Sequence, residues 1–236
     1  MSIFDVIALD ADDTLWHTEP LYTQVKDHFI ELFSNGRDPA RMENILERIE
    51  IDNLRYYGYG IKSFTLSMLE AAAEITGGQI ASNEIQQIIQ FSKQMLDADL
   101  QFLDHVVETL AELSGAYHLM LITKGDLFEQ ERKVTGSGLA KYFRYVEIVN
   151  DKTVESYRAL LEKYQIDPRS FLMVGNSLRS DILPVVTLGG NAVYIPYEHT
   201  WSHEKITARA LEKHEYYELE HLGLLPALVR QLNSAS

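Results

Sequence analysis

The chain has 236 residues, with 21 Lys and Arg against 35 Asp and Glu, which gives a formal net charge of −14. A balance this acidic argues against binding to nucleic-acid polymers or anionic membranes, because both need dense Lys and Arg. The chain has no cysteine, which excludes disulfides, thiolate metal sites and a cysteine nucleophile, and its 46% hydrophobic content is too high for a disordered chain.

The sequence carries no recognisable targeting segment. Its first five residues, Met1 to Asp5, lack the basic region of a signal peptide. No apolar run approaches the roughly 18 residues that span a bilayer. We therefore expect a cytoplasmic protein without a membrane partner, built from one or two domains.

The first predicted element is a strand over residues 6–9, a short apolar run that leads into Asp10, Asp12 and Asp13. Carboxylates packed this closely repel one another, so a counter-charge is expected beside them. A divalent cation suits such a place, because hard cations prefer oxygen ligands. The alternative is an acidic turn that only solvates the end of the strand.

Residues 16–102 show no convincing strand. Helices are predicted over residues 21–33 and 41–56, and apolar residues at helical spacing predict two more, over residues 64–75 and from the start signal at Ser82 to Leu96. We expect these helices to form a small inserted domain over the carboxyl edge of the sheet.

The second half of the chain alternates strands with helices. Strands are predicted over residues 119–122, 145–149, 171–174 and 192–195, and helices over residues 127–134, 153–164 and 180–188. Such alternation is typical of a doubly wound α/β fold with a parallel sheet. Polar residues that could carry chemistry follow two of the strands, namely Thr123 and Asn176.

Four elements in chain order resemble the motifs of the haloacid dehalogenase-like (HAD) superfamily. Asp10-x-Asp12-x-Thr14 is similar to the first motif, Thr123 to the second, Lys152 to the third, and the segment 175–181 to the fourth. The resemblance covers nearly the whole chain. It implies a Rossmann-like α/β core of residues 1–15 and 103–236, with an all-helical cap of the first type over residues 16–102.

The resemblance also implies catalytic roles. Asp10 would attack phosphorus and form an aspartyl-phosphate, and Asp12 would protonate the leaving oxygen and then deprotonate water. Thr123 would hydrogen-bond the transferring phosphoryl group. Lys152 would offset the charge of nucleophile and phosphate. The dehalogenases of the superfamily lack an Asp at position 12, because halide departure needs no proton, so Asp12 favours phosphate chemistry.

Binding roles follow from the same resemblance. The substrate contacts are expected at Thr123, Lys124 and Gly125, where backbone N–H groups help to bind the anion. Mg²⁺ is the expected cofactor, because its oxygen ligands are available in the first and fourth motifs. These metal ligands are Asp10, Asp12, Asn176 and Asp181. In the cap, Arg55 is a candidate substrate contact in the aromatic and glycine-rich segment 53–60, and the alternative for this segment is an aromatic helix end that packs on the core.

Two residues depart from the family pattern. Position 13 is Asp where the family usually has Gly, and we assign Asp13 no catalytic role. Position 176 is Asn where many members have an acid, and an amide oxygen brings no charge to a metal. Asp181 then becomes the expected charged ligand of the fourth motif.

We therefore expect a Mg²⁺-dependent phosphatase, an enzyme that hydrolyses a small phosphorylated metabolite through an aspartyl-phosphate. One alternative is a phosphomutase that uses the same nucleophile. Another is a non-catalytic protein that binds metal or phosphate, which Asp13 and Asn176 make conceivable. The sequence names neither the phosphomonoester nor the oligomeric state.

Overall fold

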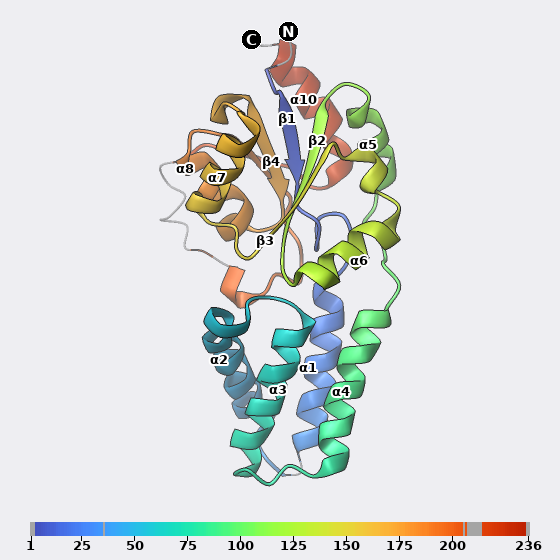
Figure 1. Cartoon of the computed structure of the whole chain (residues 1–236), viewed down its shortest axis with the longest axis vertical. Coiled ribbons are helices and arrows are strands. Elements are labelled where there is room, and N and C mark those ends of the chain that lie inside the picture. The colour runs from blue at the N-terminus through green and yellow to red at the C-terminus, as the bar shows by residue number, and fades with distance from the viewer. Residues whose placement is uncertain (1–2, 35, 205, 207–213, 235–236) are drawn as a thin grey trace. The chain divides into compact units, whose positions relative to one another are not determined.

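The computed structural model describes residues 3–34, 36–204, 206 and 214–234 (Figure 1). The chain divides into two compact units. The first comprises residues 1–17, 100–124 and 130–236, and the second comprises residues 18–99 and 125–129. In the described part of the second unit, residues 18–99 contain helices and no strand.

A six-stranded parallel sheet forms the centre of the first unit. The strands lie in the order β3-β2-β1-β4-β5-β6. Their bounds are β1 Val6–Leu9, β2 His118–Lys124, β3 Tyr145–Val149, β4 Phe171–Gly175, β5 Asn191–Tyr194 and β6 Tyr217–Glu218. This is the α/β fold class that the sequence predicts.

Strand β1 is buried on both faces, which explains its continuous apolar run. Ile7 and Leu9 belong to one core cluster of the unit, and Val6 and Ala8 belong to another. The first cluster also takes residues from α5, α6 and α10, and the second from α7 and α8. The helix bounds are α5 Val106–Ser114, α6 Leu127–Ser137, α7 Val154–Tyr164, α8 Leu183–Thr187 and α10 Leu225–Ser234.

The sheet has its switch point beside β1, which pairs with β2 on one side and with β4 on the other. In open α/β sheets, ligands bind outside the carboxyl ends of the strands at such a point. The residues that follow these ends are Asp10 after β1 and Asn176 after β4, while Thr123 lies near the end of β2. The topology therefore brings three of the sequence motifs to one edge.

The second unit is built on four helices with their own apolar core. The helices are α1 Glu19–Ser34, α2 Pro39–Tyr57, α3 Ile61–Thr76 and α4 Ser82–Asp97. Helix α2 begins at Pro39, earlier than expected, because Asp38 caps it by accepting a hydrogen bond from the Ala40 N–H at 3.1 Å. The core of the unit contains fully buried Phe29 and Met68.

The bounds of the first unit differ from the predicted 1–15 and 103–236, because it includes residues 16–17 and 100–102 and lacks residues 125–129. The His17 N–H donates to the Gln101 carbonyl at 2.9 Å, and the Leu103 N–H donates to the Leu15 carbonyl at 3.0 Å. These bonds hold the two connecting segments against each other. That the helical unit acts as a cap over the site stays a prediction.

Some elements differ from the sequence prediction. A π-helical turn over Leu178–Ile182 and the short α8 stand where one helix was expected. The sequence did not predict α5, α10 or the two-residue strand β6. Among the described residues, no helix combines the length and the apolar character that a bilayer crossing requires.

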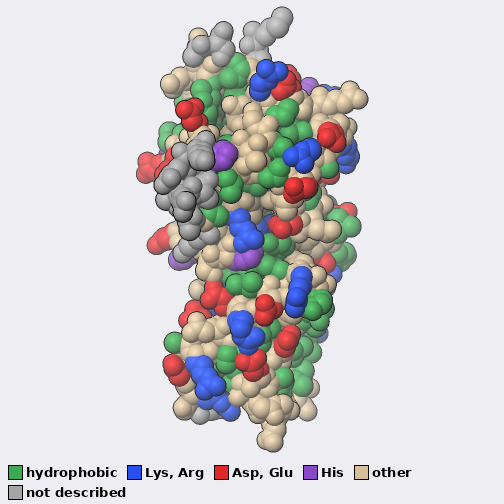
Figure 2. All heavy atoms as spheres, turned by 90° about the vertical axis from the view of Figure 1, so that its left-hand side faces the viewer, with side chains coloured by type: hydrophobic (Ala, Val, Ile, Leu, Met, Phe, Trp, Pro, Cys, Tyr) green, Lys and Arg blue, Asp and Glu red, His purple; other side chains and the backbone are tan. Residues whose placement is uncertain are grey.

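Charged side chains of both signs share the surface. Figure 2 shows one face, on which Lys and Arg side chains lie among Asp and Glu side chains. The net charge of −14 therefore does not appear there as a block of one sign. Mixed charge of this kind favours solubility.

Candidate active site

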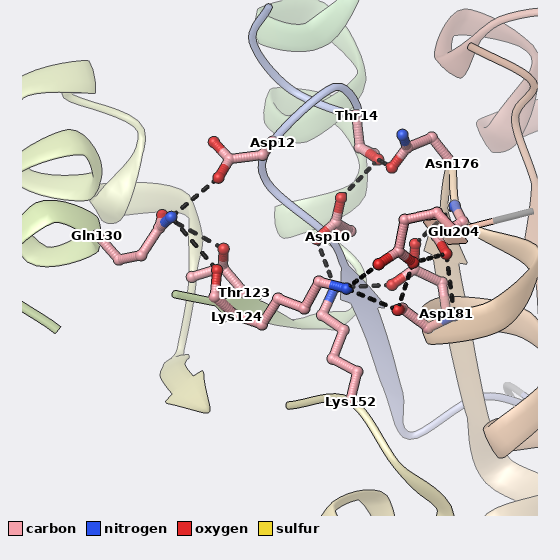
Figure 3. Close-up of polar contacts among 12 residues, drawn as sticks. Asp10, Asp12, Thr14, Thr123, Lys124, Gln130, Lys152, Asn176, Asp181 and Glu204 are labelled. Atoms are coloured by element: carbon pink, nitrogen blue, oxygen red, sulfur yellow. Dashed lines mark hydrogen bonds and ion pairs between the residues drawn. The ribbon is translucent and has the colours of Figure 1, made fainter. Parts of the chain in front are cut away.

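The turn after β1 orients the first carboxylate. Asp10 is only 6% exposed, and the Thr14 hydroxyl donates to its Oδ2 at 3.0 Å. The same hydroxyl lies 3.2 Å from the Asn176 Oδ1, so it joins the first motif to the fourth (Figure 3). Asp13 has φ of 63°, a left-handed conformation that Gly adopts freely and Asp tolerates. This explains how Asp can stand where the family usually has Gly.

Lys152 lies between two carboxylates at the centre of the site. Its side chain is buried, and its ammonium pairs with Asp10 and, at 2.7 Å, with the Asp181 Oδ1. Burial acts to lower the pKa of Lys152, yet the charges of Asp10 and Asp181 outweigh it and raise that pKa. Lys152 therefore remains an ammonium at neutral pH.

One ammonium does not neutralise both acids. With both carboxylates ionised, Asp10, Asp181 and Lys152 together carry a net charge of −1. Burial raises the pKa of Asp10 from 3.8 to about 7, since it outweighs the attraction of Lys152, and the Asp181 charge adds to the rise. The excess negative charge would favour the binding of a further cation beside Asp10.

Asp181 is held by groups of the protein at both oxygens. Lys152 binds its Oδ1, and the Ser177 N–H donates to its Oδ2 at 3.0 Å. The carboxylate lies against Gly175, where a Cβ atom would stand 2.2 Å from the Asp181 Oδ2. Glycine at the end of β4 thus makes space for the acid of the fourth motif.

We expect Gly175→Ala to destabilise the fold by about 2 kcal/mol or more, because the added methyl group must displace the buried Asp181 carboxylate. Urea unfolding measures this cost. Gly136→Ala is the matched control, since Gly136 lies in α6 with nothing within 4 Å of its added Cβ, and alanine there should be neutral or stabilising. Equal effects of the two variants would contradict the close packing at Gly175.

Asp12 points away from Asp10 and toward α6 (Figure 3). Its carboxylate accepts hydrogen bonds from the Trp16 Nε1 at 2.6 Å, the Gln130 Nε2 at 2.9 Å and the Lys133 Nζ at 2.7 Å. Burial acts to raise the pKa of Asp12, but Lys133 and these hydrogen bonds outweigh it and lower that pKa. Asp12 is therefore a carboxylate, and so a base, in this arrangement.

Thr123 joins the same network through Gln130. Its hydroxyl donates to the Gln130 Oε1 at 3.3 Å, while the amide group of Gln130 donates to Asp12. Gln130 therefore holds the second motif and the second aspartate of the first motif in one hydrogen-bonded chain. Neither Gln130 nor Lys133 was singled out from the sequence, although their spacing of three residues places both on one face of a helix.

Lys124 directs its ammonium toward the fourth motif. It donates to the Ser180 Oγ at 2.8 Å and pairs with Glu204. Only 11% of the Glu204 side chain is exposed in this contact, and no sequence pattern predicted its role. The expected contact of Lys124 with substrate stays a prediction.

The other expected substrate contacts lie in the second unit. Gly125 has φ of 145°, which favours glycine, and it belongs to the segment 125–129. The Arg55 guanidinium lies 4.7 Å from the centre of the Tyr56 ring at the end of α2. Tyr56 and Tyr57 are 67% and 53% exposed, so the aromatic end of α2 does not pack on the core, and the substrate role of Arg55 stays a prediction.

The donors at the site fit a hard cation by their chemistry. Asp10 and Asn176 each direct an oxygen to the Thr14 hydroxyl, and the buried acids carry an uncompensated charge. In the described part of the chain, no group of three or more His, Cys, Asp or Glu side chains is arranged to hold a metal ion. A cation at this site would therefore also rely on the Asn176 amide and on backbone oxygen.

Comparison with known proteins shows what the chain is similar to. A sequence model of the haloacid dehalogenase-like hydrolases matches residues 4–185. Members of that family commonly use a divalent metal. No curated protein sequence matches the chain significantly.

Several solved structures share the whole fold. A haloacid dehalogenase-like family hydrolase from Xanthomonas campestris is 34% identical, with a TM-score of 0.87 over 99% of this chain and 94% of that one. A predicted phosphoglycolate phosphatase from Haemophilus somnus is 16% identical, with a TM-score of 0.66 over 97% and 99%. An L-2-haloacid dehalogenase from Xanthobacter autotrophicus is also 16% identical, with a TM-score of 0.64 over 96% and 98%. The last two similarities show the fold alone.

Proposed function

The chain belongs to the haloacid dehalogenase-like hydrolases, and on that premise we propose that it is a Mg²⁺-dependent phosphatase acting on a small phosphomonoester. The observation that carries the proposal is the pair Asp10 and Asp12. A nucleophile alone suffices to displace a halide, whereas an alkoxide leaving group also needs a proton. Asp12 lies in the same turn as Asp10, and its carboxyl group can supply this proton.

In the proposed reaction, Asp10, Asp12 and Lys152 have different roles. The Asp10 carboxylate attacks phosphorus, so that a new P–O bond forms while the bond to the leaving oxygen breaks. Protonated Asp12 gives its proton to that oxygen. Water then attacks the aspartyl-phosphate and loses a proton to Asp12, which releases inorganic phosphate and restores Asp10. The charge of Lys152 favours the ionised form of Asp10, against the effect of burial, and it offsets negative charge during both steps.

The position of Asp12 suits its part as a base. Lys133 and Gln130 hold it as a carboxylate, the form that takes a proton from water. Its acid form requires that it leave Lys133, because that contact lowers its pKa. A Mg²⁺ ion held by Asp10, the Asp12 backbone carbonyl and Asn176 would neutralise charge on the phosphate, with Asp181 orienting Lys152 or contacting the ion.

A hydrolytic dehalogenase is the second candidate. Two observations favour it: Asn176 brings no charge to a metal, and Asp12 points away from Asp10 in this structure. In that reaction Asp10 would displace a halide from carbon and water would hydrolyse the ester. A phosphomutase remains a third possibility for the same nucleophile, and it would form a sugar-phosphate isomer instead of free phosphate. We also propose that the protein is cytoplasmic and that its substrate is a small metabolite.

A parallel screen for phosphate release and halide release, with wild type and Asp12→Asn, tests the proposal. Phosphomonoesters with Mg²⁺ should release phosphate, and Asp12→Asn should lower kcat by about 10²- to 10⁴-fold, the usual contribution of a general acid–base. Asp5→Asn is the control, because Asp5 is an exposed aspartate beside β1. Halide release that survives Asp12→Asn, without phosphate release above an Asp10→Asn background, would refute the phosphatase.

A further inference from the structure

Glu204 is a largely buried acid in the segment that follows β5. It ends a short 3₁₀ turn, Ser202–Glu204, and only 11% of its side chain is exposed. No sequence motif and no part of the proposed reaction includes it. A carboxylate is costly to bury without partners, so its surroundings must compensate it.

Three side chains bind this one carboxylate, and Figure 3 labels Lys124 among them. The Lys124 ammonium pairs with its Oε1, while the hydroxyls of Ser177 and Ser180 both donate to its Oε2, the latter at 2.6 Å. Lys124 also donates to the Ser180 Oγ at 2.8 Å, so the network closes on itself. Burial acts to raise the pKa of Glu204, but Lys124 and these hydrogen bonds outweigh it, and the pKa falls from 4.5 to about 2.

The backbone beside Glu204 is fixed as well. The Arg179 guanidinium, from the fourth motif, donates to the His203 carbonyl at 2.8 Å. Arg179 therefore fixes the backbone of His203, the residue before Glu204. The network thus fixes both the carboxylate and the backbone that carries it against residues 177–180. These residues comprise Ser177, which caps the π-helical turn, and the first three residues of that turn, and we call them the turn 177–180.

The contacts of Glu204 connect two motifs to the reacting carboxylate. Lys124 directly follows Thr123, and the turn 177–180 directly precedes Asp181. Asp181 in turn holds Lys152, which pairs with Asp10. A shift of this turn would therefore reach the Lys152 ammonium through one contact, with Asp181, and the nucleophile Asp10 through a second.

We propose that Glu204 is a positioning residue, which holds the Lys124 ammonium and the turn 177–180 in the arrangement that turnover at Asp10 requires. This inference rests on the proposed function, because it assigns Glu204 a part in the same reaction. Glu204 acts through Lys124, Ser177 and Ser180, and it touches neither the nucleophile nor the phosphoryl group. Its role is distinct from that of a metal ligand.

Glu204→Gln is the sharpest variant, because glutamine keeps the size and an acceptor oxygen for the serines but loses the charge that binds Lys124. We expect kcat to fall about tenfold with KM changed less than twofold, since the substrate still binds but the site is misaligned. Lys124→Met should cause the same loss, and the double variant should lose no more than either. Glu147→Gln, which removes an acid bound to Lys163 elsewhere in the unit, is the control and should leave kcat unchanged.

A second readout separates this inference from the choice of substrate. Beryllofluoride with Mg²⁺ mimics a phosphoryl group on an aspartate, and its binding is measured by ¹⁹F NMR without any turnover. We expect Glu204→Gln and Lys124→Met to weaken this binding about tenfold as well. If no phosphomonoester is hydrolysed but this weakening is found, the substrate assignment fails and the positioning role stands.

Three outcomes would overturn the positioning role. Unchanged kcat and unchanged beryllofluoride binding in Glu204→Gln would show that the contact is only structural. A lower KM with unchanged kcat would show that Glu204 competes with substrate for Lys124. A wild-type protein that neither turns over any substrate nor binds beryllofluoride would overturn the positioning role and the proposed function together.

Discussion

Asp10→Asn is expected to abolish turnover, by at least about 10³-fold, while the fold becomes more stable. The loss follows because an amide cannot form the acyl-phosphate that splits hydrolysis into two steps. The gain follows because the buried site holds more negative charge than Lys152 neutralises. Lys152 keeps its partner Asp181 in the variant, so no buried ammonium is left alone.

The gain in stability should depend on pH in a defined direction. The pKa of Asp10 is raised from 3.8 to about 7, so the folded state binds its proton more tightly than the unfolded state. Wild-type stability is therefore lost relative to the variant as the pH rises from 3.8 to about 7. We expect urea unfolding without added metal to show a difference of about 4 kcal/mol at pH 8 and almost none at pH 4.

Magnesium should reverse the order of the two proteins. A cation beside Asp10 compensates the excess charge, so Mg²⁺ should raise the wild-type free energy of unfolding more than that of Asp10→Asn. Asp167→Asn is the control, because Asp167 is an exposed aspartate paired with Arg169. Residual turnover in Asp10→Asn close to the wild-type value would show that another group is the nucleophile.

The sequence predicted the sheet well because its strands are continuous apolar runs. β1 and β4 are buried on both faces, and such strands leave a short hydrophobic signal that ends at a polar residue. The polar residues at the ends of these runs identified Asp10, Thr123 and Asn176 as candidate site residues. Parallel strands bring their carboxyl ends, and therefore these residues, to one edge of the sheet. β6 gave no such signal, since it has two residues and both are exposed.

The fourth motif shows where local patterns fail. Residues 180–188 were predicted as one helix from their apolar spacing, whereas the structure has a π-helical turn before α8. The Asp181 carboxylate in this turn binds Lys152, which lies 29 residues away along the chain. Propensity cannot report contacts with residues distant in sequence.

The partners of the site residues were harder to predict than the residues themselves. A resemblance of motifs names Asp12 and Lys124, but it does not say that Lys133 holds the first or that Glu204 holds the second. Glu204 lies 80 residues from Lys124 along the chain, so no spacing rule connects them. The orientation of Asp12 away from Asp10 was equally invisible in the sequence.

Lys152→Met should have the largest effect on stability. Removing one partner of a buried ion pair leaves an uncompensated charge, which costs about 3–5 kcal/mol, and here two carboxylates lose their shared ammonium. Turnover should be lost together with the fold's stability, because the nucleophile then favours its protonated form. Urea unfolding and phosphate release measure the two losses.

The dependence on pH and on a second substitution distinguishes this cause from simple loss of packing. Without the ammonium, protonation relieves the repulsion between Asp10 and Asp181, so the destabilisation should shrink as the pH falls. Asp10→Asn combined with Lys152→Met should cost less than Lys152→Met alone, because one buried charge is gone. Lys163→Met is the matched control, since that lysine is 57% exposed in its pair with Glu147 and its replacement should leave stability nearly unchanged. A cost of Lys152→Met that is the same at every pH and in both backgrounds would mean that its aliphatic chain, and not its charge, holds the site together.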